Sequence, residues 1–558
     1  MKKLVALTLA LILTLGIGVP ALGEGSSRIC DETITVTVSG RSANAGVAAW
    51  NDTIQVAELE SRLGIRLDCH EYSSDAWESQ LTLMMAGDDM PDMLINTGIS
   101  LADVADYGSQ GYFLALNDYI PEYAPDMAAF MKEYPMVEKY MTSPDGNMYA
   151  VVGYWGMEVF QINYNWLRSD YLRALGSEVP RTLDEFTQLM YDIRDKDVNN
   201  NGDAGDEWGI SFSGDNAGGV ENMLLNAFGI YTSANDMLWT LDENGSLTMG
   251  ETTENYKMYL KYMNKLFEDG CIDPESFIQT RDEWKAKAAN EQVALFTDGA
   301  IGSVHSKGDQ YTSENFTWIG ALTSEYSAQP TITRKNNAVT NTAKVLISAD
   351  TRYPKELVQL VNYFYTEEGY WAGRFGYEGM TFEFVECGIK GSEDYKIQKS
   401  YNADFHPEKV EPFGFSNYSS PEDFRQKKVT VNAAFTINVL SPNSIYGLAE
   451  HCESIEQLDA IIEDATYGWA SIITKGLRSN EFSYVDGVPT RIYTEDEVEK
   501  RAVIYNDILL YLQTMKTQFI NGTADIDVHW DEFQAQLKTL RIDELTEIEQ
   551  AAYDRLMK

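Results

Sequence analysis

Apolar and polar residues alternate near the start of the chain in the way that strands and amphipathic helices require. The predicted elements are, in order, a strand at 34–38, a helix at 53–63, a strand at 65–67, a helix at 74–86 and a strand at 91–95. This order predicts a parallel sheet with helices on its faces, and therefore an α/β fold.

Ligands of such sheets bind beyond the carboxyl ends of the strands. Asn96 and Thr97 follow the third predicted strand directly. Trp50 follows the first strand through a loop rich in glycine, alanine and asparagine. These three residues are therefore candidate ligand contacts at one end of the sheet.

Helical signals continue through the second half of the chain. Residues 182–185 read Thr-Leu-Asp-Glu, a capping box, and an apolar stripe begins at Phe186. Further helical patterns cover 353–365 and 495–519. No internal repeat or long linker separates these segments, so two domains that the chain enters more than once fit the pattern.

A dense set of oxygen-bearing side chains follows the capped helix. Ca²⁺ takes about six to eight oxygen ligands, and Gly202 permits the sharp turn that such a loop needs. An EF-hand would place a bidentate glutamate at its twelfth position, where this chain has Trp208. The sequence predicts a structural, EF-hand-like calcium loop, and a solvated Asx turn is the alternative. The candidate ligands are Asp197, Asn199, Asn201, Asp203, Asp206 and Glu207.

The first 23 residues resemble a secretory signal peptide, because two lysines precede a short apolar run and small residues. No later run is long and apolar enough for a membrane span. The formal net charge of −43 disfavours nucleic acid and anionic lipid as partners. The five cysteines are scattered and allow one or two bridges at most.

Sequence motifs of common enzymes are missing. The chain has no Gly-x-Ser-x-Gly, no P-loop and no His-Glu-x-x-His, and its five histidines are dispersed. A carboxylate pair for glycoside hydrolysis is compatible with 86 acidic residues but is not indicated by them. We therefore expect no enzymatic activity.

Several segments, in this order, resemble bacterial extracellular solute-binding proteins of family 1, the receptors of ABC importers. The segments are 86–94 (AGDDMPDML), 111–120 (GYFLALNDYI), 164–167 (YNWL), 179–186 (VPRTLDEF), 291–296 (EQVALF), 375–379 (FGYEG) and 550–555 (QAAYDR). The loop at Asp197 resembles the calcium loop of the larger, oligosaccharide-binding members. Most Gram-positive members carry a lipobox, which this chain lacks.

The resemblance implies two α/β lobes, joined by a hinge, that close over a ligand in the cleft between them. The lobes are expected at 31–155 plus 300–350 and at 156–299 plus 351–558. Tyr154 and Trp155 then lie at the first crossing between lobes, Asp298 ends the returning strand, and Glu378 lies in a family-like turn.

Sugars suit these positions, because aromatic faces match their C–H patches and carboxylates match their hydroxyls. Aromatic residues make up 12% of the chain, although most tryptophans in such a chain pack internally. Arg41 could meet a carboxylate, which would imply an acidic sugar or a peptide; a surface arginine is the favoured interpretation.

The predicted function is that of a secreted, monomeric receptor that is extracellular, at the cell surface or in the periplasm. It captures a carbohydrate, in particular an oligosaccharide, and delivers it to the membrane subunits of an ABC permease. Two alternatives stay open: a secreted glycoside hydrolase or lyase, and a surface adhesin or sensor built on the same fold.

Overall fold

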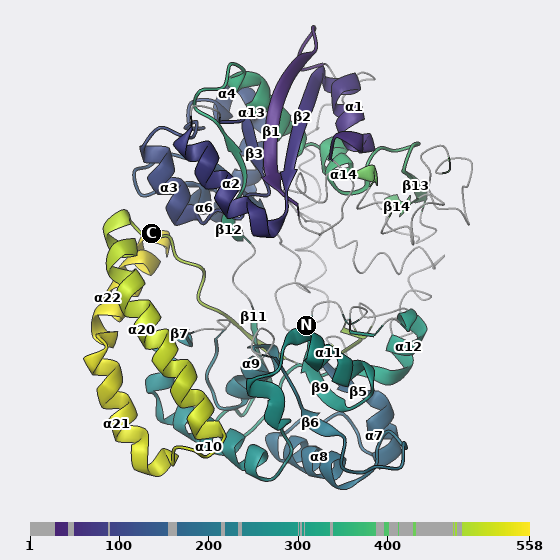
Figure 1. Ribbon diagram of the computed structural model, residues 1–558, viewed down its shortest axis with the longest axis vertical. Coiled ribbons are helices and arrows are strands. Elements are labelled where there is room, and N and C mark those ends of the chain that lie inside the picture. Colours follow the sequence, from purple (N-terminus) through teal and green to yellow (C-terminus); the bar gives the residue numbers. More distant parts are fainter. Residues whose placement is uncertain are drawn as a thin grey trace, which may run out of the picture.

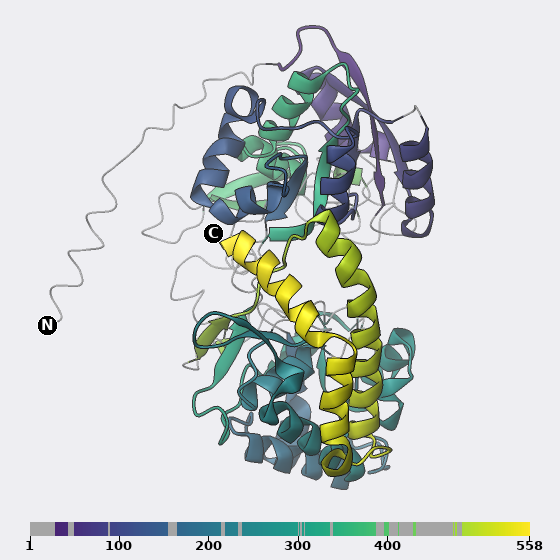
Figure 2. The ribbon, with the colours of Figure 1, turned by 90° about the vertical axis from the view of Figure 1, so that its left-hand side faces the viewer.

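The computed structural model describes residues 28–42, 50–87, 90–154, 164–213, 218–232, 237–298, 301, 304–305, 307–334, 339–386, 396–400, 411, 424, 428–430, 472–473, 475–476 and 482–557. The predicted signal peptide and Trp155 lie outside these ranges. Two α/β bodies are stacked along the long axis of the molecule (Figure 1). Three C-terminal helices run along the lower body and reach the upper one (Figure 2).

The upper body, or first lobe, is built on a five-stranded sheet of order β2-β1-β3-β12-β4. Its strands are β1 (Ile34–Arg41), β2 (Ile65–Tyr72), β3 (Met93–Ile95), β4 (Ala150–Tyr154) and β12 (Val339–Ile347). Its helices are α1 (Ile54–Leu63), α2 (Ser74–Ala86), α3 (Leu101–Ser109), α4 (Ile120–Tyr123), α5 (Pro125–Glu133), α6 (Pro135–Met141), α13 (Pro354–Tyr363) and α14 (Glu367–Phe375).

The lower body, or second lobe, contains a four-stranded sheet of order β10-β5-β9-β6. Its strands are β5 (Asn165–Arg168), β6 (Trp208–Ile210), β9 (Val293–Thr297) and β10 (Phe316–Trp318). Its helices are α7 (Ser169–Leu175), α8 (Leu183–Asp195), α9 (Gly218–Ala227), α10 (Glu254–Glu268), α11 (Arg281–Ala289), α12 (Gly308–Asn315), α20 (Glu495–Ile520), α21 (Ile526–Thr539) and α22 (Ile542–Met557).

Two-stranded sheets pair β7 (Trp239–Leu241) with β8 (Leu247–Met249), β11 (Thr331–Arg334) with β15 (Ser483–Asp486), and β13 (Phe382–Glu386) with β14 (Lys396–Ser400).

Local sequence signals set the ends of several helices. The Thr53 side chain accepts a hydrogen bond from the Val56 N–H at the start of α1, and Gly64 ends that helix at φ 75°. The capping box at Thr182 and Glu185 is present at the start of α8. Apolar residues of both helices lie in the cores, so the predicted helices and the α/β class are confirmed.

Packing differs from the predicted lobe ranges at two segments. Residues of 354–377 lie in the same core as β1 to β4, although this segment was assigned to the second lobe. Strand β10 pairs with β5 and thus belongs to the second sheet, although 300–350 was assigned to the first lobe. The chain therefore returns to the first sheet only at β12, which runs antiparallel to β3 and makes this sheet mixed.

The strand directions show where the chain crosses between lobes. Strands β1, β3 and β4 run the same way, because β12 is antiparallel to both β3 and β4. The chain leaves the first lobe at Tyr154, so the carboxyl ends of β1 and β3 lie on that edge. It enters the second lobe at Asn165, which pairs with Thr297 at the end of β9. We call these two edges the first and second crossing edges.

No helix in the described ranges has the length and apolarity that a membrane crossing would need. Cys30, Cys69 and Cys271 are buried and free. The other two cysteines lie outside the described residues.

Candidate functional site

Asn96 and Thr97 lie on the first crossing edge, as expected for residues that follow β3. The Asn96 amide donates to the Arg41 carbonyl over 2.8 Å, and its φ of 50° turns the chain at the edge. The Thr97 side chain is buried and donates to the Ala343 carbonyl over 2.9 Å. Both side chains thus tie neighbouring strand ends together, and their role as ligand contacts stays a prediction.

Trp50 packs inside the first lobe. It is 2% exposed, and its ring closes on β1 so tightly that a Cβ on Gly40 would lie 2.8 Å from a ring carbon. The indole N–H is buried without a hydrogen-bond partner in the described part of the structure. The aromatic face is therefore not available for stacking against a sugar, in contrast to what its loop position suggested.

Tyr154 ends β4 at the first crossing edge and is half-buried. Its ring centroid lies 4.7 Å from that of Tyr134 and 5.6 Å from that of Phe130. Burial raises the pKa of its phenol above the usual value, and the charge of Glu133 adds to this rise. Tyr154 thus belongs to an aromatic cluster that borders the crossing.

Asp298 lies at the second crossing edge, immediately after β9. It is 3% exposed, and its carboxylate accepts a hydrogen bond from the Arg281 guanidinium over 2.7 Å. Its carbonyl accepts from the indole N–H of Trp166 over 2.8 Å. Glu378 lies elsewhere, exposed in the turn after α14. The structure thus places Asp298 near the crossing and leaves Glu378 on the first lobe.

A cavity of about 500 Å³ lies between the lobes, beside the first crossing edge. The first lobe contributes α3, α6 and β12 to its wall, and the second lobe contributes β7, the segment after β15, and α20. Its aromatic lining consists of Tyr140, Trp239, Tyr493 and Tyr505. The sequence analysis missed this cavity, because its wall residues are scattered over four hundred positions.

Two arginines in the cavity wall are held by one buried carboxylate. Glu549 on α22 accepts hydrogen bonds from Tyr493 over 2.6 Å and from Arg501 over 2.7 Å, and it pairs with Arg491 at 2.5 Å. The guanidinium of Arg501 lies 3.9 Å from the ring centroid of Tyr505. These contacts fix the aromatic wall, so the cavity is preorganised on the side of the second lobe.

The acidic loop at 197–207 is wound around its own side-chain oxygens. Each of four side chains accepts a hydrogen bond from a backbone N–H further along the loop. The pairs are Asp197 with Gly202 at 2.8 Å, Asn199 with Asn201 at 2.9 Å, Asn201 with Asp203 at 2.8 Å and Asp203 with Gly205 at 3.0 Å.

Two carboxylates close the base of this loop. One oxygen of Glu207 accepts from the N–H groups of Val198 and Asn199, both over 3.1 Å. The other Glu207 oxygen and Oδ1 of Asp206 are buried without a hydrogen-bond partner in the described ranges. Burial raises the pKa of the Glu207 carboxyl, against the hydrogen bond from Asn199. Two buried oxygens beside other acids are groups that a cation would stabilise.

Within the described chain, no group of three or more His, Cys, Asp and Glu side chains is placed to hold a metal ion. A cation in the loop would therefore need the amide oxygens of Asn199 and Asn201 as well as carboxylates. Such mixed oxygen donor sets are ordinary for Ca²⁺.

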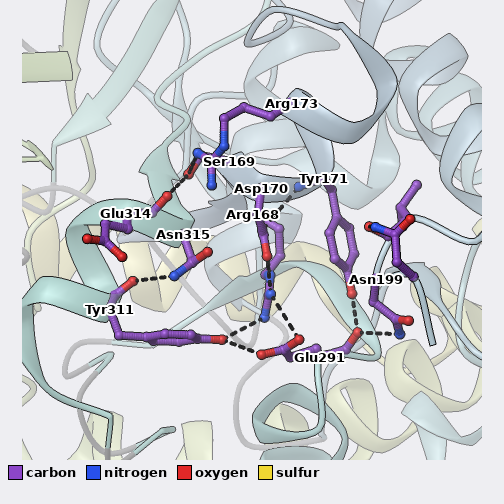
Figure 3. A network of polar contacts seen from close by, with 12 residues as sticks. Arg168, Ser169, Asp170, Tyr171, Arg173, Asn199, Glu291, Tyr311, Glu314 and Asn315 are labelled. Atoms are coloured by element: carbon purple, nitrogen blue, oxygen red, sulfur yellow. Dashed lines mark hydrogen bonds and ion pairs between the residues drawn. The ribbon is translucent and has the colours of Figure 1, made fainter.

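A polar network joins the loop to the second sheet (Figure 3). The Asn199 amide donates to the Glu291 carbonyl over 3.2 Å, and the Tyr171 hydroxyl donates to the same oxygen. The Glu291 carboxylate accepts from Tyr311 over 2.7 Å and lies 3.6 Å from the guanidinium of Arg168. The loop is therefore anchored to the backbone of Glu291, whose side chain joins the network around the buried Arg168.

Known proteins resemble this chain over most of its length. Residues 55–375, more than half of the chain, match the model of the family described as bacterial extracellular solute-binding protein. The fructooligosaccharide ABC transporter substrate-binding protein FusA of Streptococcus pneumoniae serotype 4 is 24% identical over 512 residues, which cover 90% of this chain and 87% of that protein.

Solved structures show the same fold. The S. pneumoniae FusA EF-hand mutant, in complex with fructo-nystose, superposes with a TM-score of 0.70 at 21% identity, covering 94% of this chain and 99% of that one. An HMO-binding, ABC-transporter-associated solute-binding protein of Bifidobacterium longum infantis gives 0.69 at 17% identity, covering 95% and 100%. The expected family and two-lobed fold are thus confirmed: this chain belongs to the bacterial extracellular solute-binding proteins.

Proposed function

We propose that this protein is the carbohydrate receptor of an ABC importer, which captures an oligosaccharide between its crossing edges and presents it to a membrane permease. The observation that carries the proposal is the correspondence with the fructooligosaccharide receptor FusA along 90% of this chain and 87% of that protein. A correspondence of this extent covers both lobes and the segments that connect them, which are the parts that a closing receptor needs.

The geometry supports capture by closure. The two crossing edges lie on different lobes, and a ligand that contacts both stabilises the closed arrangement over the open one. Tyr154 offers aromatic surface on one edge, and Arg281, held by the buried Asp298, offers a polar group on the other. In this mechanism the receptor only binds and releases the ligand, so the ligand is chemically unchanged when it leaves. The extracellular family fits a receptor that meets its ligand outside the cell membrane.

Oligosaccharide binding is expected to raise the thermal stability of the protein and to compact it. A ligand at about 100 times its dissociation constant stabilises the native state by roughly 2.7 kcal/mol. Thermal-shift measurements with fructooligosaccharides and other glycans, followed by small-angle X-ray scattering of the hits, check both effects. Unchanged melting and scattering across the panel would contradict the proposal. Shortened glycans in the recovered ligand would instead support the hydrolase alternative.

We also propose that the acidic loop binds a structural Ca²⁺ ion. Asp197, Asn199, Asn201, Asp203, Asp206 and Glu207 would supply the oxygens, and the two buried, unpartnered oxygens of Asp206 and Glu207 support this assignment. Backbone N–H groups already donate to the side-chain oxygens of the loop, so the ion would mainly reduce the repulsion between the carboxylates. The hydrogen bond from Asn199 to the Glu291 carbonyl links the loop to the second sheet, so an ordered loop would also stabilise the second lobe.

Chelation is expected to lower the melting temperature of the wild-type protein by several degrees, because removing a ligand bound at 100-fold excess over its dissociation constant costs roughly 2.7 kcal/mol. The Asp206→Asn variant should melt lower than wild type in calcium and respond little to EDTA. Asp242→Asn is the matched control: Asp242 caps another turn, accepting from the Asn244 and Ser246 N–H groups at 2.8 Å. It should keep the full response to EDTA. An identical wild-type melting curve with and without chelator would contradict the assignment.

A further inference from the structure

Two basic side chains lie together on the first crossing edge. Arg41 is the last residue of β1, and its guanidinium lies over Gly98, where a Cβ would stand 3.0 Å from the guanidinium carbon. Lys344 lies on β12, and its carbonyl accepts the N–H of Asn96 on the same edge. Its side-chain carbons run past Gly153 of β4, 3.3 Å from the Cβ position there. Glycines at 98 and 153 thus leave the space that both cations occupy.

No acid among the described residues pairs with either cation. Arg41 and Lys344 are half-buried, and in the described part of the chain neither side chain forms a hydrogen bond or an ion pair. Glu71 is adjacent to Gly40 in the strand register, so it points to the opposite face from Arg41. Burial lowers the pKa of Lys344, and the charge of Arg41 lowers it further, so the two charges act on each other.

This arrangement is unusual in a chain with 86 acidic and 43 basic residues. Several buried or partly buried bases elsewhere in the described chain have carboxylate partners, as in the pairs Arg168 with Asp170, Lys287 with Asp273 and Arg491 with Glu549. Two adjacent like charges withdrawn from water are unfavourable unless an anion joins them. The missing partner is thus expected from outside the chain, at the edge where the ligand is held.

We propose that Arg41 and Lys344 form an anion subsite, so that the captured oligosaccharide carries an acidic group at the position that meets the first crossing edge. This rests on the proposed function and narrows its substrate class to acidic glycans. A carboxylate or a sulfate oxygen pair fits the planar fork of Arg41, and the Lys344 ammonium acts as a point charge beside it. The subsite binds the acidic group only, and the sugar units are bound by other residues of the crossing edges.

Calorimetric titration tests the proposal with three tetrasaccharides: one of galacturonic acid, one sulfated and one neutral. We expect an acidic tetrasaccharide to bind wild type at least about 10-fold more tightly than the neutral one, and Arg41→Gln and Lys344→Met each to remove about 10-fold of that affinity. Comparison of the two acidic ligands identifies the carboxylate or the sulfate as the preferred group. Arg352→Gln is the matched control, because Arg352 is exposed beyond the far end of β12. It should change no affinity.

The ligand-free melting temperature separates this role from a structural one. Removing one of two adjacent cations should leave the melting temperature of either variant unchanged or raised. A clear fall in both variants would overturn the inference, because it would show that these charges stabilise the fold. Tighter binding of the neutral ligand, unaffected by Arg41→Gln, would also overturn it while the proposed function stands. Binding of no tetrasaccharide and no other glycan would overturn the proposed function, and the subsite with it.

Discussion

Replacing Arg168 by methionine is expected to lower the free energy of unfolding by about 3–5 kcal/mol, because it removes the buried cation that two partly buried carboxylates, those of Asp170 and Glu291, share. The Arg168 side chain is 1% exposed and donates to Asp170 over 2.8 Å. Burial alone would lower its pKa, but the hydrogen bond and charge of Asp170 hold the pKa above its ordinary value. The guanidinium also lies 5.2 Å from the ring centroid of Phe316. It lies 3.6 Å from the Glu291 carboxylate, which Figure 3 shows beside it.

Denaturant unfolding, followed by tryptophan fluorescence, measures this effect. Arg173→Met is the matched control, since Arg173 is exposed on α7 and its side chain bonds, among the described residues, only to the Ser169 hydroxyl one turn earlier. It should change the stability by less than about 0.5 kcal/mol. An Arg168→Met protein within 1 kcal/mol of wild type, roughly the mean effect of a point mutation, would show that the network contributes no more than an exposed ion pair.

The second large effect concerns pH. Glu251 is 2% exposed, and both its carboxylate oxygens accept the Leu238 N–H, at 3.0 and 3.1 Å. Burial raises the pKa of its carboxyl to about 8, despite its backbone hydrogen bonds and the charge of Lys516. In the unfolded chain the carboxyl releases its proton near pH 4.5. The folded state thus binds more protons between these values, and its stability falls as the pH rises from about 4.5 to about 8.

Glu251→Gln removes this dependence and keeps an acceptor for Leu238. The variant should match wild type within about 1 kcal/mol at pH 5 and exceed it by about 3–5 kcal/mol at pH 8. Unfolding at both pH values measures the difference, in which the contributions of other groups cancel. Glu243→Gln, in the exposed turn between β7 and β8, should follow wild type at both values. Equal stability differences at pH 5 and pH 8 for Glu251→Gln would contradict the assignment.

For some residues of the candidate site the position predicted from the sequence agrees with the structure, and for others tertiary packing gives a different environment. Asn96 lies on the first crossing edge, as the alternation of strands and helices predicted, and Tyr154 lies there as the family resemblance implied. Trp50 occupies the expected loop, but its ring turns into the core against Gly40. Loop position does not specify side-chain direction, and burying an aromatic ring is the favourable outcome unless a ligand requires otherwise.

The assignment of segments to the two lobes was also predictable only in part. Helix α13 was predicted from its apolar stripe, yet its stripe packs on the first sheet and not on the second. Any amphipathic helix satisfies its own periodicity on either sheet, so the pattern cannot select one. The return of the chain through β12 decides the matter, because β12 pairs with β3 and β4 and the following segment 354–375 then packs into the core of the first lobe.

By itself, the sequence predicted the first three strands and several helices, the capping of α8, the oxygen-rich loop and the family. All of these except the family depend on residues within about one helical turn or one strand of each other, where local geometry is fixed by residue type. The family followed from the order of short segments along the whole chain. The tertiary structure alone decided the burial of Trp50, the aromatic cavity, the partners of Arg168 and the meeting of Arg41 with Lys344. Arg168 and Glu291, like Arg41 and Lys344, are more than one hundred residues apart, and only the packing of whole sheets and helices brings such positions together.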